Sequence, residues 1–272
     1  MNNLKKIGLT ALAGSLVAST AYAGALSVSG SAGVKYQSKR GSSGATSVQG
    51  NTRSDSNGID HSGGGEMDNG MTVGVSYTMT DAAFSTSNVT LDMGDAGKLA
   101  FGHDSAHGGI DTIKDKMPTA GEEAWDDHGS SDDAGVTDLG ADASLYYSVN
   151  MSGITASASY ARTGLGTDNS IALVASELVD GAEFGIGTAT NVISNTSEDD
   201  MMTVYGKYTS GPITFGVQLS EIDKTAANTD VDREHASISF AVNENLSLSY
   251  GVSNVEYEAT AKTDEESSGF SA

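Results

Sequence analysis

The segment Met71-Thr72-Val73-Gly74-Val75-Ser76-Tyr77-Thr78-Met79-Thr80 alternates between apolar and polar or small side chains at every step. Successive side chains of a β-strand point to opposite faces, so the segment predicts a strand with one apolar and one polar face. The preceding Asp68-Asn69-Gly70 predicts a tight hairpin turn, because Asn-Gly tolerates the positive φ angles of such turns. Strand and turn together indicate an antiparallel sheet.

The same alternation recurs along the whole chain, and we expect about 13 full strands and the start of another at 268–272. The apolar positions of these strands begin at Leu26, Met71, Val89, Leu99, Ala143, Ile154, Ile171, Phe184, Met202, Ile213, Ala236 and Leu246, with a weaker glycine-rich candidate at 59–67. Glycine occupies 34 of 272 positions. A helical bundle is therefore disfavoured, since each helical Gly costs about 1 kcal/mol relative to Ala. The predicted fold class is all-β.

Short and long connections alternate between these strands. The short turns lie at 94–97, 150–153, 179–181, 210–212 and 243–245. We expect longer polar loops at 37–57, 80–86, 103–140, 161–169, 189–200, 220–234 and 254–267. An up-and-down meander places all short turns at one end of the sheet, whereas a sandwich with Greek-key crossovers has no reason to show this alternation.

The chemistry of the two faces indicates a membrane barrel. The polar positions are mostly Ser, Thr and Gly with occasional Asp or Lys, which is typical of a pore lining. Tyrosines lie near strand ends, as in the aromatic girdles of membrane barrels: Tyr36, Tyr77, Tyr160, Tyr208 and Tyr250. A sheet in lipid must close on itself, because hydrocarbon leaves edge groups without partners. We therefore predict an antiparallel up-and-down transmembrane β-barrel.

The N-terminus has the pattern of an export signal. Lys5 and Lys6 precede an apolar stretch at 7–18, and Ala21-Tyr22-Ala23 forms a small-x-small cleavage pattern. We expect a signal peptide at 1–23 and a barrel at 24–272. The apolar stretch is short for a membrane anchor, which needs about 20 residues.

Composition excludes several function classes. The formal net charge of −22 argues against nucleic-acid binding, which needs clustered Lys and Arg. The absence of Cys excludes disulfides, thiolate metal sites and a Cys nucleophile. Periodic apolar residues throughout the chain argue against disorder.

Two stretches carry a family resemblance. Gly65-Glu66-Met67-Asp68-Asn69-Gly70-Met71-Thr72-Val73 is similar to a hairpin of alphaproteobacterial general porins. Asp115-Lys116-Met117-Pro118-Thr119-Ala120, followed by Glu122-Glu123-Ala124-Trp125, resembles the inward-folded third loop of those proteins. The resemblance implies a trimeric, water-filled barrel of about 16 strands in the Gram-negative outer membrane, open to small hydrophilic solutes and ions. It also implies that 103–140, after the fifth strand, folds into the pore.

The end of the chain departs from that family pattern. Family members end in a strand whose last residue is aromatic, whereas this sequence stops at Phe270-Ser271-Ala272, where a strand begins. With 13 to 14 of about 16 strands present, we expect a C-terminally truncated barrel.

The long 103–140 segment holds the predicted pore constriction. Its candidate carboxylates are Asp111, Asp115, Glu122, Glu123, Asp126 and Asp127. The candidate basic residues of the opposite wall are Lys35, Lys39, Arg40 and Arg53. Acids that face bases across a narrow aqueous gap create a transverse field that orients dipolar solutes. The alternative is an ordinary solvated surface loop. Thr119 and Glu122 have capping-box spacing, which predicts a short helix.

Other chemistry is weakly indicated. His103 and His107 lack a third ligand at diagnostic spacing, so we predict no metal, cofactor or catalytic site. The acidic stretches 197–200 and 229–232 are candidates for Ca²⁺ at low specificity. Two alternatives to a porin are a barrel-type enzyme and a secreted β-rich adhesin. The enzyme needs a Ser/His pair that the sequence does not show, and the adhesin needs a fixed repeat period, whereas the strand spacing is irregular.

Overall fold

The computed structural model describes residues 26–43, 46–80, 83–103, 108–121, 144–176, 178–194, 196–225, 229–259 and 263–272, with the backbone alone at 33–43, 46–56, 84 and 103. Within these residues, 14 strands form one sheet in chain order, each antiparallel to its neighbours. No pairing among the described residues joins the last strand back to the first. The predicted signal peptide at 1–23 lies outside the described residues.

The strands are β1 (Ser27–Ser43), β2 (Thr46–Glu66), β3 (Thr72–Thr80), β4 (Ala83–Asp92), β5 (Lys98–His103), β6 (Ser144–Met151), β7 (Ile154–Arg162), β8 (Thr167–Ala175), β9 (Ala182–Ser194), β10 (Ser197–Ser210), β11 (Ile213–Lys224), β12 (Val231–Asn243), β13 (Leu246–Tyr257) and β14 (Glu265–Ser271). Two short 3₁₀ helices, η1 (Gly94–Ala96) and η2 (Gly109–Thr112), flank β5. The prediction of an all-β antiparallel meander is confirmed.

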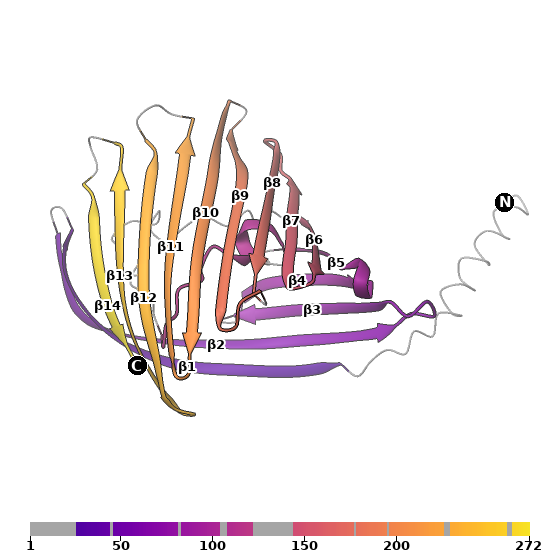
Figure 1. The fold of residues 1–272 in the computed structure, drawn as a ribbon, viewed down its shortest axis with the longest axis horizontal. Helices are drawn as coiled ribbons and strands as arrows, with labels where there is room; N and C mark the ends of the chain where they lie inside the picture. The colour runs from indigo at the N-terminus through magenta and orange to yellow at the C-terminus, as the bar shows by residue number, and fades with distance from the viewer. Residues whose placement is uncertain are drawn as a thin grey trace, which may run out of the picture.

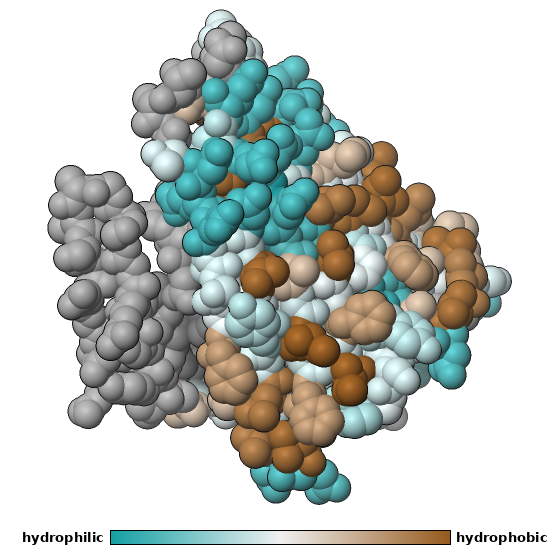
Figure 2. Space-filling model, turned by 60° about the vertical axis from the view of Figure 1, so that its left-hand side comes forward, coloured by the Kyte–Doolittle hydropathy of each residue, from teal (hydrophilic) through white to brown (hydrophobic). Residues whose placement is uncertain are grey.

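The sheet curls so that β1–β3 and β9–β14 run in different directions around a hollow (Figure 1). The face turned away from the hollow, called the outer face below, carries the predicted apolar positions. On β11, for example, Phe215, Val217 and Leu219 are 51%, 49% and 44% exposed. The inner face of β11 instead carries Thr214, Gly216, Gln218 and Ser220. In Figure 2 apolar residues cover much of the visible surface and hydrophilic ones gather toward one end. This distribution matches a wall between lipid and water.

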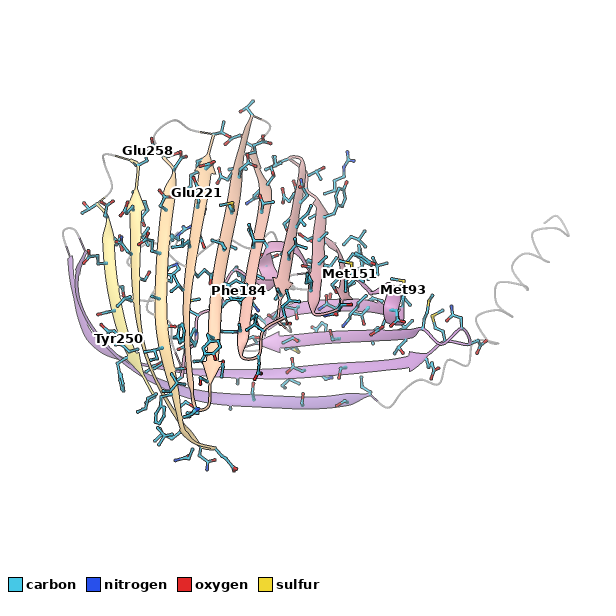
Figure 3. The ribbon with its side chains drawn as sticks, in the orientation of Figure 1. Met93, Met151, Phe184, Glu221, Tyr250 and Glu258 are labelled. Atoms are coloured by element: carbon cyan, nitrogen blue, oxygen red, sulfur yellow. The ribbon has the colours of Figure 1, made fainter. Side chains whose placement is uncertain are left out.

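The two ends of the upright strands differ on the outer face. At the short-turn end, aromatic side chains gather, and the rings of Tyr208 and Phe215 are 5.7 Å apart. At the other end, outward positions carry carboxylates. The labelled Phe184 and Tyr250 lie in the lower half of Figure 3, and Glu221 and Glu258 lie at the top. The apolar outer band therefore ends in charge on one side and in aromatic rings on the other.

Some predicted loops are strands. β1 and β2 pair continuously from Ser27 opposite Ser62 to Ser43 opposite Thr46, so the predicted loop 37–57 is largely a hairpin. The predicted loop 189–200 likewise belongs to β9 and β10. The physical reason is that a ladder of backbone hydrogen bonds does not require apolar side chains, and both segments are mostly polar in sequence, so no alternation marks these strands.

The predicted turn at Asp68-Asn69-Gly70 is confirmed. Gly70 has a φ of +82° and donates its N–H to the Met67 carbonyl oxygen at 2.9 Å, as a hairpin turn requires. The predicted short helix at 118–124 stays a prediction, because residues 122–124 lie outside the described residues. At its start, Thr119 Oγ1 accepts the N–H of Gly121 at 3.1 Å, a contact that an N-cap residue makes. No helix among the described residues is long and apolar enough to cross a membrane.

Candidate pore site

Residues 108–121, called the inward strap below, leave the end of β5 and lie inside the curve of the sheet (Figure 1). Its first turn, η2, packs against β7, β8 and β9. The backbone N–H of Gly109 donates to Ser157 Oγ at 3.1 Å, and that of Ile110 donates to Ser170 Oγ at 2.9 Å. Inward hydroxyls of the wall thus satisfy the N–H groups that begin this helical turn.

An apolar core fixes the first half of the strap to the wall. Ile110 and Ile113 are 0% exposed and Met117 is 5% exposed. They pack with inward residues of β8 to β11, namely Ala172, Ala189, Met201, Tyr205 and Ile222. An apolar cluster inside a barrel excludes water from that side of the lumen. Any aqueous passage therefore runs between the strap and the opposite side of the sheet.

The wall facing this core is lined by glycines at the tightest contacts. A Cβ at Gly187 would lie 2.8 Å from Ile113 Cδ1, and one at Gly216 would lie 2.9 Å from Pro118 Cδ. Larger residues at these positions would push the strap away from the sheet, because contacts under 3.0 Å require a shift. Glycine in these strands is therefore explained by close packing.

Gly109 is the tightest position of the strap itself and gives a testable prediction. Its φ is +66°, and a Cβ there would lie 1.8 Å from Ser170 Oγ. We expect Gly109→Ala to displace η2 from β8 and to accelerate hydrogen exchange of the Ile110 amide. Gly211→Ala is the matched control, because Gly211 has a φ of +58° and open space around its Cβ position. Equal effects of both variants on the Ile110 amide would contradict the steric explanation.

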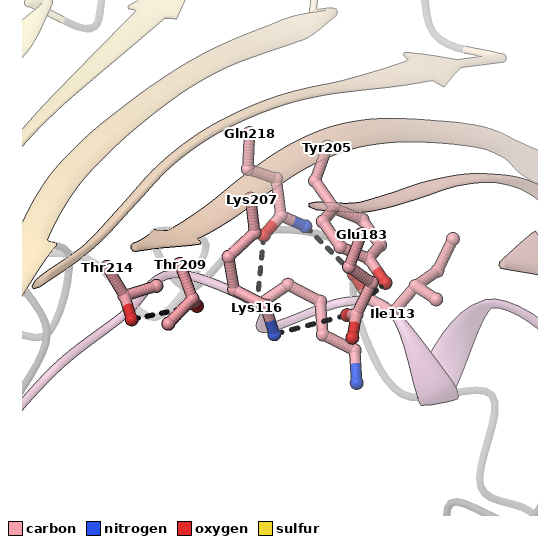
Figure 4. A network of polar contacts seen from close by, with 8 residues as sticks. All are labelled: Ile113, Lys116, Glu183, Tyr205, Lys207, Thr209, Thr214 and Gln218. Carbon is pink, nitrogen blue, oxygen red and sulfur yellow. Dashed lines mark hydrogen bonds and ion pairs between the residues drawn. The ribbon is translucent and has the colours of Figure 1, made fainter. Parts of the chain in front are cut away.

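A single side chain of β11 holds the middle of the strap. Gln218 Nε2 donates to the carbonyl oxygens of Ile113 at 2.9 Å and Lys114 at 3.0 Å, and Gln218 Oε1 accepts the N–H of Lys116 at 3.1 Å (Figure 4). Nε2 is also 3.0 Å from Thr203 Oγ1. Gln218 is only 1% exposed. The Gln218 amide thus supplies hydrogen-bond partners to backbone groups of the strap that have none in a helix or a strand.

Serine hydroxyls hold the end of the strap. Ser237 Oγ of β12 donates to the Pro118 carbonyl oxygen at 2.8 Å, and the Ala120 N–H donates to Ser249 Oγ of β13 at 2.9 Å. Ser249 in turn lies 2.6 Å from Ser271 Oγ of β14. The strap thus reaches from β7 to the last strand, held by side chains of successive strands.

Charged groups meet where the strap passes β9 and β10. Lys207 Nζ of β10 forms an ion pair with Glu183 Oε1 of β9 at 3.1 Å, and the Tyr205 hydroxyl donates to Glu183 Oε1 at 2.7 Å. The side chain of Lys116 extends toward the same carboxylate (Figure 4). At this point the strap contributes the base, Lys116, and the wall contributes the acid, Glu183. The predicted site residues of the loop were all acids, whereas the strap carries both acidic and basic side chains.

The predicted carboxylates of the strap differ in exposure. Asp111 in η2 is 6% exposed, whereas Asp115 is exposed at the strap surface. Although the residue is accessible to water, desolvation of its carboxyl by neighbouring atoms raises the pKa of Asp115, against the opposing attraction of Lys114 and Lys116. The predicted residues Glu122, Glu123, Asp126 and Asp127 lie outside the described residues.

The predicted basic wall stays a prediction. Lys35, Lys39 and Arg40 belong to β1 and Arg53 belongs to β2, with Lys35 opposite Ser54 and Arg53 opposite Tyr36. The side chains of all four lie outside the described set.

The described residues contain no group of three or more His, Cys, Asp or Glu side chains placed to hold a metal ion. The acidic stretch 197–200 belongs to β10, and Val231-Asp232 belongs to β12, so these Ca²⁺ candidates are mostly strand rather than loop. His107 lies outside the described residues.

Sequence reasoning missed the residues that anchor the strap. The contacts of Gln218, Ser170 and Ser249 with the strap join residues 60 to 130 positions apart, which no local pattern reveals. One signal was present. Ile110, Ile113 and Met117 form a spaced apolar set in an otherwise polar loop, which indicates packing against a wall.

The geometry is therefore a curved antiparallel sheet with an apolar outer face and a loop folded onto its inner face. A family model of Gram-negative porins matches residues 8–272. The chain belongs to the Gram-negative porin family. No curated protein sequence matches it.

Solved structures of an outer-membrane protein and of a porin share the fold. The OmpT loop L8 deletion mutant of Vibrio cholerae matches this porin with a TM-score of 0.59 and 14% identity, covering 90% of this chain and 86% of that one. A trimer form of OmpT gives 0.59 and 15%, covering 90% and 81%. A Rhodopseudomonas blastica porin mutant gives 0.54 and 15%, covering 90% and 98%. At these identities the likeness concerns the fold.

Family membership places this porin in the outer membrane of a Gram-negative cell. The apolar outer face of the sheet, with its aromatic end, is the surface such a location requires.

Proposed function

We propose that this porin forms a water-filled channel for passive diffusion of small hydrophilic solutes and ions, without enzymatic activity. The observation that carries the proposal is the inward strap, which lies on the polar inner face of a sheet whose outer face is apolar. The strap narrows a passage that would otherwise be open, so its exposed side chains select among solutes. Planar-bilayer recordings and liposome swelling with sugars of graded size test the proposal. A preparation that inserts but neither conducts nor admits sugars would overturn it.

The channel is proposed to act as a homotrimer in contact with outer-membrane lipid. The trimer form of Vibrio cholerae OmpT supports this assembly for the shared fold. Mild extraction from membranes should yield a heat-labile oligomer, and chemical cross-linking should stop at three subunits.

The proposed constriction carboxylates are those of the 103–140 segment, opposed by the basic residues of β1 and β2. Of the two candidates that the structure describes, Asp111 is 6% exposed and Asp115 is exposed, so Asp115 contributes more to the surface that ions meet. Combined neutralisation of Glu122, Glu123, Asp126 and Asp127 to Gln or Asn tests the remainder as a set, through the reversal potential in a salt gradient.

Asp115→Asn is expected to lower the preference for cations over anions. A unit charge near the ion path contributes about 1 kcal/mol, which is a factor of about five in the permeability ratio. Lys116→Gln removes a nearby positive charge and should shift the reversal potential in the opposite direction. Shifts of the same sign in both variants would contradict a direct electrostatic role.

The pH dependence has a defined sign. Because the pKa of Asp115 is raised, its carboxylate loses its charge on acidification at a higher pH than an ordinary Asp. On acidification, the cation preference should therefore begin to fall at a higher pH than carboxylates of ordinary pKa would cause. Asp115→Asn should remove this early step. The same raised pKa means that the charged form is disfavoured in the folded protein, so acidification through this range relieves a small cost of folding.

A further inference from the structure

The backbone of the strap between η2 and Pro118 has hydrogen-bonding groups that regular structure does not satisfy. The Ile113 N–H closes η2 on the Ile110 carbonyl oxygen at 2.9 Å, and residues 115–119 are irregular. The carbonyl oxygens of Ile113 and Lys114 and the N–H of Lys116 face β11 and meet the amide of Gln218. Since these groups lie against the wall, a lost partner is not simply replaced by water.

The position of Gln218 makes it the central anchor. Its Cα neighbours are Tyr205 on β10 and His235 on β12. Before this point the strap is held by the apolar packing of Ile110 and Ile113. After it, Met117 packs in the same core, and serine hydroxyls of β12 and β13 bind the backbone of Pro118 and Ala120. Gln218 holds the irregular backbone at 113–116 between these two sets of contacts.

The chemistry of the contact requires a primary amide of this length. It donates through Nε2 to two carbonyl oxygens and accepts through Oε1 from one N–H, which no hydroxyl or carboxylate can do. The other inward residues of β11 are Thr214, Gly216, Ser220 and Ile222, so the strand offers no substitute.

We infer that Gln218 is a positioning residue of the pore, whose amide fixes the height at which Lys114, Asp115 and Lys116 enter the lumen and thereby keeps the open channel steady. The inference rests on the proposed channel function and adds the residue that controls it. Loss of the amide frees the three charged residues to change position, and the current through the passage then fluctuates among substates.

The experiment uses the full chain, purified from membranes as its oligomer, in three variants. Gln218→Leu keeps most of the volume and removes all the polar contacts. Gln218→Glu keeps the acceptor for the Lys116 N–H but sets a carboxylate against two carbonyl oxygens. Thr214→Val is the control, because Thr214 is an inward residue of the same strand whose hydroxyl lies 3.0 Å from Thr209 Oγ1, outside the contacts of Gln218 and Thr203.

Two measurements are made. Hydrogen exchange followed by mass spectrometry reports the Lys116 amide, and planar-bilayer recording reports substate occupancy. For Gln218→Leu we expect roughly tenfold faster exchange of the Lys116 amide and roughly tenfold more time in substates, the change that about 1.4 kcal/mol produces. Thr214→Val should match the wild type in both.

Acidification provides a rescue that a general packing defect would not show. A protonated Glu side chain donates one hydrogen bond and accepts another. Channels of the Gln218→Glu variant should therefore spend less time in substates as the bath is acidified, relative to wild type at the same pH. This variant also keeps the test valid if Gln218→Leu fails to fold.

The failures are distinguishable. A wild type that forms no channel overturns the proposed function, and exchange of the Lys116 amide then still decides whether Gln218 holds the strap. A conducting wild type whose Gln218 variants show unchanged exchange and unchanged substates overturns the inference. Equal disturbance by Thr214→Val also overturns it, because the effect would then belong to the wall in general.

Discussion

An arginine introduced at Val75 is expected to destabilise the folded porin strongly, whereas an arginine at the adjacent Ser76 is expected to be tolerated. Val75 lies near the middle of the apolar side of β3 and is 49% exposed on the outer face. A cation there enters hydrocarbon, which costs about 2–4 kcal/mol near the bilayer midplane of a membrane barrel. That is a large share of the 5–15 kcal/mol by which proteins are typically stable.

Ser76 is the matched control, because it is next in sequence and points to the inner face. Its Cα partners Ser62 and Asn88 are both polar. An arginine there meets water, so the effect should be a change of ion preference rather than of stability. The measurement is urea unfolding in lipid bilayers, followed by tryptophan fluorescence or gel mobility. Equal destabilisation at both positions would show that β3 is buried on both faces.

The sequence predicted the strands well because the apolar outer band imposes a strict two-residue period. Met71 to Thr80 is an example, in which every second side chain must face lipid. The same rule explains where prediction failed. At 37–57 the sequence is almost entirely polar residues and glycine, so no alternation indicates the continuous pairing of β1 with β2.

The path of the strap was predicted only from resemblance, and its anchors were not predicted at all. The capping-box spacing of Thr119 and Glu122 accounts for the contact of Thr119 Oγ1 with the Gly121 N–H but not for the Ala120 N–H, which donates to Ser249 on β13. A distant hydroxyl satisfies a backbone group for which the local pattern offered no partner. Gln218 could be noted in sequence as a long amide among small inward residues, but its contacts required the fold.

Ile113 carries the largest expected effect on the pore itself. Its side chain is 0% exposed and lies in the apolar core between the strap and β8 to β11, so Ile113→Ala should cost the packing of the strap about 2–5 kcal/mol. Ile113→Asp should cost more, because it places a carboxylate in a dry cluster. The strands keep their own ladder of backbone hydrogen bonds, so we expect the barrel to stay folded while the strap detaches.

The readout that separates these two events is single-channel conductance, compared with the thermal stability of the oligomer. A detached strap should change the mean conductance and broaden the distribution of open levels, while the β-sheet circular dichroism signal persists. Ile213→Ala is the matched control, since Ile213 is an outward residue at the start of β11 with 41% exposure. It should leave conductance unchanged, because it touches lipid and not the lumen. If Ile113→Asp gives wild-type conductance in a folded oligomer, the strap does not border the path of the ions, and the constriction belongs to another part of the chain.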